Sequence, residues 1–245
     1  MQNSDQAGSA AKAIKGRNSM NLTNLRRSTG IFGLIATIIS LTSLPLYFIY
    51  PDAPPQWTVL TRVLITILGS SLLIVFLCGF RLVVREDNPV REWEATVVLV
   101  SGLMWLAFSL VAKAMEAGTV IVSPEPIESA RFGALAPGQF LLWGSIGRAM
   151  TTLFLSASAI AILRGRLMPA WFGRSSWVLA AVNVAFVPSI FFGPDSTHFY
   201  SANGWGTTAT IPGLVLCWIL VASIILIRTP DNFTSGLQSA GALTP

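Results

Sequence analysis

Six long apolar runs, separated by shorter polar segments, dominate the pattern along this chain of 245 residues. An α-helix rises 1.5 Å per residue, so about 20 apolar residues cross a hydrocarbon layer of about 30 Å. The strands of a membrane barrel would instead alternate polar and apolar residues, and these runs do not alternate. The pattern predicts an all-α fold, a polytopic bundle of about six transmembrane helices, over Ile31–Tyr50, Val59–Phe80, Ala95–Ala114, Phe140–Leu163, Trp177–Phe192 and Ile211–Ile227.

The two ends of the chain lack such runs. Residues 1–29 are rich in Ser, Asn, Ala and Gly and hold five Lys and Arg residues, so we expect a disordered basic tail. Residues 30–228 form the predicted transmembrane domain, and residues 229–245 form a second short tail. The first run is longer than the apolar part of a cleaved signal peptide, and no A-x-A site follows it, so we expect a retained helix.

Charge is sparse and unevenly distributed along the chain. Charged residues make up 11% of the sequence and hydrophobic residues 53%, whereas about 25% of a soluble domain is charged. If the N-terminus is cytoplasmic, the inside segments hold twelve Lys and Arg residues and the outside segments only Arg131. This bias predicts cytoplasmic N- and C-termini, with the lipid bilayer rather than nucleic acid as the partner.

The residue types that usually hold metals or carry out catalysis are scarce. The chain has one histidine, His198, and two cysteines, which lie in separate apolar runs without CxxC spacing. We therefore expect no metal and no cofactor. No nucleophile motif is visible, and the cores of the helices hold no Asp, Glu or His, so we name no catalytic residue and the pattern weighs against an enzyme.

Arg148 is the most informative polar residue. It lies about 13 Å along the fourth run, and an arginine near the middle of a membrane costs at least about 2.5–3.5 kcal/mol. Gly144, Arg148, Thr152 and Ser156 recur every four residues and share one helix face. Arg148 either snorkels or pairs within the structure, or it lines a cavity and binds an anionic or carbonyl group.

Two more runs carry polar stripes at the same spacing. The second run has Arg62, Thr66 and Ser70, and the third has Ser101, Trp105, Ser109 and Lys113, with Glu116 beyond. We expect three helices to turn these faces together around a cavity that opens outward. The candidate ligand-binding residues are Arg148, Lys113, Glu116, Arg62, Thr152 and Ser109. In the alternative, Arg62, Lys113 and Glu116 lie at the level of the lipid headgroups, where charge costs little.

The last outer loop and the fifth run hold weaker candidates. Turn-forming residues fill Gly193–Gly206, where Asp195 and His198 are candidates because histidine titrates near neutrality. A solvated loop histidine is the simpler interpretation. Asn183, Pro188 and Ser189 interrupt the fifth run, which predicts either a packing kink or a hinge.

Two segments resemble parts of other proteins. The stretch Arg164-Gly-Arg-Leu-Met-Pro-Ala-Trp-Phe-Gly joins two apolar runs, and the chain has Leu-Cys-Trp-Ile-Leu-Val-Ala-Ser-Ile-Ile-Leu-Ile-Arg in its last run. Together they resemble uncharacterised bacterial six-helix integral membrane proteins. The resemblance implies a bacterial inner-membrane protein and assigns no functional residue.

Two functions fit the sequence. The first is binding or moving a small molecule or lipid through an outward-facing polar cavity, which rests on Arg148 and the polar stripes. The alternative is a non-catalytic accessory or regulatory subunit of a larger membrane complex, in which small-residue faces contact partner subunits or a second copy of the chain.

Overall fold

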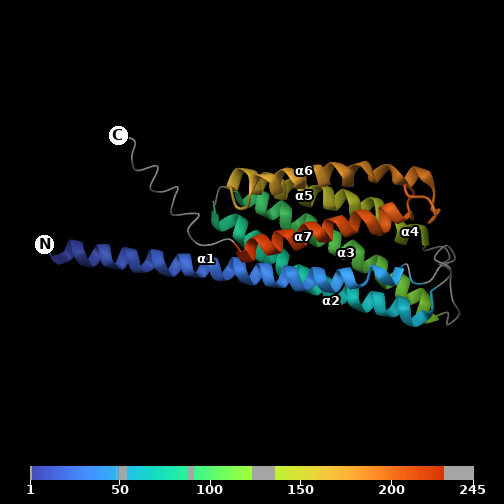
Figure 1. Ribbon diagram of the computed structural model, residues 1–245, viewed down its shortest axis with the longest axis horizontal. Helices are drawn as coiled ribbons and strands as arrows, with labels where there is room; N and C mark the ends of the chain where they lie inside the picture. The colour runs from blue at the N-terminus through green and yellow to red at the C-terminus, as the bar shows by residue number, and fades with distance from the viewer. Residues whose placement is uncertain (1, 48, 50–53, 88–90, 123–135, 229–245) are drawn as a thin grey trace.

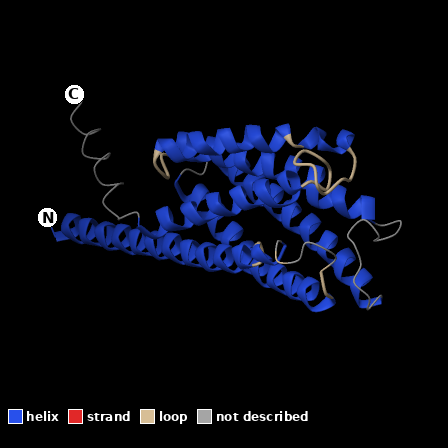
Figure 2. Ribbon diagram, turned by 45° about the vertical axis from the view of Figure 1, so that its right-hand side comes forward, coloured by secondary structure: helices blue, strands red, loops and turns tan. Residues whose placement is uncertain are grey.

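The computed structural model describes residues 2–47, 49, 54–87, 91–122 and 136–228. Within these ranges the chain forms helices and no β-strand, and six of the helices are long and apolar enough to cross a membrane (Figure 2). This confirms the predicted six-helix transmembrane fold. The six spans are Leu22–Tyr47, Gln56–Arg85, Glu92–Val122, Pro137–Gly165, Ala170–Phe192 and Gly206–Arg228.

Several spans combine an α-helix with a short segment of tighter or wider helix. The fourth span joins α4 to α5 through a π-helical segment, the fifth ends in a 3-10 helix that contains Pro188, and the sixth starts with a π-helical segment. Pro188 therefore does interrupt the fifth helix. In chain order the elements are α1 (Gln2–Thr42), η1 (Pro45–Tyr47), α2 (Gln56–Asp87), α3 (Glu92–Val122), α4 (Ala136–Leu141), η5 (Leu142–Ile146), α5 (Gly147–Gly165), α6 (Ala170–Ala185), η6 (Val187–Phe192), η7 (Gly206–Thr210) and α7 (Ile211–Arg228).

The N-terminal segment differs from the expected disordered tail. Helix α1 begins at Gln2, so residues 2–29 continue the first membrane span as one helix (Figure 1). The segment contains no proline, which would end a helix, and it includes Ala, Lys, Arg and Gln residues, which favour one. Extending a helix that already exists avoids the cost of nucleation. The predicted C-terminal tail, 229–245, lies outside the described residues.

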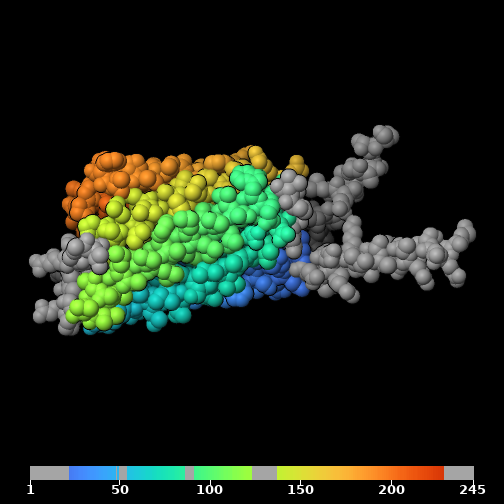
Figure 3. Space-filling view, turned by 180° about the vertical axis from the view of Figure 1, so that it is seen from behind, coloured from blue at the N-terminus to red at the C-terminus, as the bar shows by residue number. Residues whose placement is uncertain are grey.

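The helices pack in a ring around a shared core. Helix α1 packs against α2 and α7, α3 lies between α2 and α5, and α6 packs against α5. Figure 3 shows part of this order on one face, with α6, α5, α3 and α2 following one another across the bundle. The start of α1 and the end of α7 lie at the same end of the bundle (Figure 1).

Ion pairs tie the helices together at that end. Arg85 Nε lies 2.9 Å from Glu92 Oε2, and Arg81 also pairs with Glu92, which joins α2 to α3. Arg164 Nη1 lies 3.1 Å from the buried Glu94, which joins α5 to α3. We call this the basic end and the other the opposite end. The arginines that lie in or beside the helix termini here include Arg81, Arg85, Arg91, Arg164, Arg166 and Arg228, all of which the charge pattern predicts to be cytoplasmic.

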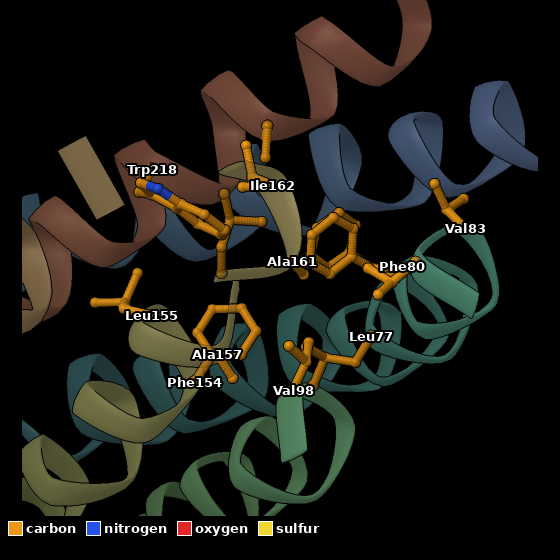
Figure 4. Close-up of a cluster of buried hydrophobic side chains, with 14 of the residues drawn as sticks. Leu77, Phe80, Val83, Val98, Phe154, Leu155, Ala157, Ala161, Ile162 and Trp218 are labelled. Atoms are coloured by element: carbon orange, nitrogen blue, oxygen red, sulfur yellow. The ribbon is translucent and has the colours of Figure 1, made fainter. Parts of the chain in front are cut away.

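Aromatic side chains fill the half of the core nearer the basic end. The Trp218 ring stacks on Phe172 at 5.0 Å and meets Phe154 edge-on at 5.6 Å. Its Nε1–H donates to Ser176 Oγ at 2.9 Å, so α7 is hydrogen-bonded to α6. Figure 4 shows Trp218 of α7 in one apolar cluster with Phe154 and Ile162 of α5 and Phe80 of α2. Such ring pairs stabilise the fold by more than their buried apolar area would predict, because edge-to-face and offset-stacked contacts add a favourable electrostatic interaction.

Glycines let α1 approach its two neighbours closely. A Cβ on Gly33 would lie 2.3 Å from Ser223 Oγ of α7, and one on Gly79 of α2 would lie 2.2 Å from Thr29 Oγ1. Close approach of backbones at small residues is a common way for membrane helices to associate, since lipid supplies no hydrophobic drive between them.

Candidate functional site

A cavity of about 60 Å³ lies among α1, α2, α3, η5 and α7, in the half of the bundle nearer the opposite end. Its volume accommodates a few water-sized groups, well below the roughly 300–1,000 Å³ of a drug-sized pocket. Hydroxyl and aromatic side chains supply most of the wall, and leucines and a proline supply the rest. The lining residues are Ser40, Ser43, Leu44, Tyr47, Thr66, Ser70, Leu73, Trp105, Leu106, Ser109, Trp143, Thr208, Pro212 and Leu216.

A buried ionic cluster lies beside this cavity. Glu116 of α3 accepts from Arg62 Nη2 of α2 at 3.0 Å and from Lys113 Nζ on its own helix. The side chains of all three are about 6–7% exposed. Two cations share one carboxylate, so the cluster keeps a net positive charge. Such a pair persists in a low-dielectric interior only when its geometry and hydrogen bonds are good.

Tyr47 connects the ionic cluster to the cavity. Arg62 Cζ lies 4.1 Å from the centre of the Tyr47 ring, and Lys113 Nζ donates to the Tyr47 hydroxyl oxygen. Lys113 Nζ also lies 5.2 Å from the centre of the Trp143 ring. Both aromatic residues line the cavity, so the positive charge lies directly behind its aromatic wall.

Two residues of the cavity wall have a hydrogen-bond donor that is not used within the described chain, whereas the hydroxyls of Ser43, Thr66, Ser109 and Thr208 already donate to backbone carbonyls. Trp105 is 5% exposed, lines the cavity, and its Nε1–H has no partner among the described residues. The Tyr47 oxygen accepts from Lys113, which leaves its own O–H free to donate elsewhere. A buried donor without an acceptor costs about 1–3 kcal/mol. The wall is therefore suited to a group with an oxygen acceptor.

The two π-helical segments meet at the edge of the cavity. Trp143 Nε1 of η5 donates to the carbonyl oxygen of Thr208 in η7 at 3.0 Å. Gly144 has a non-helical backbone (φ −80°, ψ −105°), and a Cβ there would lie 3.0 Å from the carbonyl oxygen of Ala202. A π-turn inside an α-helix often marks a functional site. Here it allows Trp143 to reach η7.

Arg148 neither lines the cavity nor pairs with the ionic cluster. It is fully buried at 0% exposed, and none of its three guanidinium nitrogens has a hydrogen-bond partner among the described residues. Its burial shows that Arg148 does not snorkel to a membrane surface.

Two polar side chains near Arg148, one in η5 and one in α5, contact the fifth span. Thr151 Oγ1 donates to Asn183 Oδ1 at 2.7 Å, and the hydroxyl oxygens of Ser145 and Ser189 lie 3.4 Å apart. The polar face of α5 is therefore turned toward the fifth span. Thr152, a candidate from the sequence, donates to the Arg148 carbonyl oxygen at 2.8 Å and does not line the cavity.

Asp195 and His198 form an exposed pair in the loop at the opposite end. Asp195 Oδ1 accepts from the Thr197 hydroxyl at 2.7 Å and from the Thr197 backbone N–H at 2.8 Å. These hydrogen bonds, with the nearby His198, hold the pKa of Asp195 below its usual value. His198 Nδ1 lies 3.7 Å from Asp195 Oδ2, and both side chains are well exposed. The pair lies in a surface turn and not beside the cavity.

The candidate residues thus lie in three places. Arg62, Lys113 and Glu116 form the ionic cluster, and Ser109 lines the cavity next to them. Arg148 and Thr152 lie on α5 and do not line the cavity, and Asp195 and His198 lie in the exposed loop. The polar stripes of α2 and α3 do face one cavity, but α1 and α7 complete it, where α5 was expected. Tyr47, Trp143 and Thr208 escaped the sequence analysis because contacts between distant helices place them there.

Comparisons with known proteins give no relative. No family model, curated protein or solved structure matches the chain.

Proposed function

We propose that this membrane protein binds, or moves across part of the bilayer, a small molecule or one end of a lipid in the cavity bounded by α1, α2, α3 and α7. The observation that carries the proposal is the buried, unpartnered Nε1–H of Trp105, a residue that lines the cavity. A bound oxygen acceptor would remove the cost of leaving that buried donor unsatisfied.

The shape and polarity of the cavity support a small, partly apolar ligand. Hydroxyl and aromatic groups of the wall lie beside leucine side chains. A cavity of about 60 Å³ holds only a small chemical group. With the basic end on the cytoplasmic side, as the positive-inside pattern predicts, the cavity would lie in the outer half of the bundle, where a lipid or a solute from outside would enter.

Native mass spectrometry of the full chain in a mild detergent tests this proposal. We expect the wild type to retain a bound mass, and Trp105→Phe, which keeps the ring but removes the donor, to weaken its binding about 5- to 30-fold. Trp177→Phe is the matched control, because Trp177 is an exposed residue of α6 and does not line the cavity.

Two results would contradict the proposal. The first is a wild-type chain that carries no bound mass after mild extraction, because the cavity would then hold no ligand. Equal retention by wild type and Trp105→Phe would place the ligand elsewhere. A second protein chain in the wild-type spectrum would favour the accessory-subunit function instead.

A further inference from the structure

Arg148 is a second feature that the proposed function does not use. Its side chain is fully buried, and all three of its nitrogens lack a hydrogen-bond partner among the described residues. Arginine keeps its charge at neutral pH and carries five N–H donors. Removing one partner of a buried charge pair is strongly destabilising, because the remaining charge is uncompensated. A guanidinium in this position requires a counter-group.

The carboxylates whose side chains the structure describes are committed elsewhere. Glu116 pairs with Arg62 and Lys113, while Glu92 and Glu94 pair with arginines at the basic end. Asp195 lies in the exposed loop with His198. None of them is paired with Arg148, so the described part of the chain offers this arginine no internal counter-ion.

Polar side chains on the adjacent turns of α5 are also engaged. Ser145 lies against Ser189, and Thr151 donates to Asn183. These contacts join α5 to the fifth span on either side of Arg148 along the helix. They leave Arg148 as the one side chain of this stretch that is fully buried, charged and without a partner.

We propose that Arg148 is the anchor of a buried oxyanion site, separate from the cavity, that takes a carboxylate or phosphate group. The planar fork of a guanidinium matches two oxygens of such a group in a bidentate pair. Arg148 lies about 16 Å from the start of its span at Pro137, so a headgroup phosphate at its ordinary depth does not reach it. The oxyanion enters the protein, either as a small solute or as the acidic group of a lipid.

The junction of η5 and η7 is the entry that the structure offers. Gly144 lies one turn before Arg148 on the side of the opposite end, and its backbone departs from helical geometry. The carbonyl oxygen of Ala202 and the methyl group of Thr207 cover this turn, 3.0 Å and 3.3 Å from the position of a Cβ on Gly144. A displacement of η7 away from η5 would therefore uncover the turn of the fourth span that precedes Arg148.

Thermal stability of the full-length protein in a mild detergent provides the test. Buffers of matched pH and ionic strength contain sodium phosphate, sodium acetate or sodium chloride. We expect phosphate or acetate to raise the Tm of the wild type by about 5 °C relative to chloride, the shift that a ligand at about 100 times its Kd produces in a chain of this size.

Three variants locate the effect. Arg148→Met should remove the dependence on the oxyanion, and Arg148→Lys, which keeps the charge without the fork, should retain a smaller shift. Arg174→Met is the matched control, since Arg174 is an exposed residue of α6 near the basic end, and it should keep the full shift. If Arg148→Met does not fold, the comparison of wild type, Arg148→Lys and Arg174→Met still decides the question.

Native mass spectrometry of the same samples separates the two sources of the oxyanion. An acidic lipid that the wild type retains and Arg148→Met loses identifies a lipid group, whereas a Tm shift without a retained lipid identifies a small solute. The proposal is overturned if the wild type shows neither, or if Arg148→Met shows the same shift and the same retained lipid as the wild type. Because Arg148 does not line the cavity, these results are independent of those with Trp105→Phe.

Discussion

Two buried positive sites in one bundle are built in opposite ways. At the first, Arg62 and Lys113 share Glu116 and lie against the ring of Tyr47. At the second, Arg148 is more deeply buried and has no partner among the described residues. Charge in a membrane interior is costly at both sites. At the first site a carboxylate of the chain offsets that cost. At the second site the guanidinium N–H groups stay available to the proposed oxyanion. The paired charges therefore stabilise the bundle, and the unpaired charge of Arg148 is the one that the proposed oxyanion would balance.

The largest effect on stability is expected when the ionic cluster loses its carboxylate, so that its cations, like Arg148, have no counter-ion. Glu116→Gln leaves Arg62 and Lys113 buried without their carboxylate, so we expect the protein to lose about 3–5 kcal/mol of stability. Thermal unfolding in detergent measures the loss. Glu92→Gln is the matched control, because Glu92 is 44% exposed and its ion pairs should contribute below about 1 kcal/mol. Similar losses for the two variants would contradict the view that Glu116 holds a buried cluster together.

A smaller effect of opposite sign is expected at Arg148. In chloride buffer Arg148→Met removes a buried charge and leaves no partner behind, so stability should stay unchanged or rise by up to about 2 kcal/mol. The same unfolding measurement applies. A loss as large as that of Glu116→Gln would mean that Arg148 has a structural partner, and the contrast between the two sites would fail.

The smallest effect is expected where charge is exposed to water. The pKa of Asp195 is held below its usual value by hydrogen bonds from Thr197. A carboxyl whose pKa is lower in the folded state stabilises the fold above the unfolded pKa, and this contribution is lost as the pH falls through the folded pKa. We therefore expect a small Tm difference between wild type and Asp195→Asn at pH 6 that shrinks below pH about 4. A difference that grows on acidification would contradict this assignment.

The six spans were predictable from the sequence because apolar length is a local property. The structure starts or ends most spans a few residues outside the predicted runs, since polar residues such as Glu92 and Arg85 continue a helix into the headgroup region. The N-terminal segment was the main exception. Its composition suggested a tail, but local helix propensity and the attached span make it helical.

The candidate site was predictable only in part. The four-residue spacing correctly put Thr66 and Ser70 on one face of α2, and Trp105 and Ser109 on one face of α3, and these faces line the cavity. The same spacing grouped Arg148 with Thr152, but it could not say which neighbour that face would meet. Helix periodicity fixes which residues share a face, whereas the rotation of the helix depends on the packing of its neighbours.

The sequence by itself determined that this chain is a six-helix membrane protein with few, costly charges. Those properties depend on the lengths of the apolar runs and on the number of charged residues, both of which can be read from the order of residues alone. Only the tertiary structure decided that Glu116 pairs with Arg62, that Tyr47 and Trp143 complete the cavity, and that Arg148 is buried without a partner. These outcomes depend on contacts between residues far apart in the chain, because close packing at small residues sets how each helix is rotated and which side chains meet.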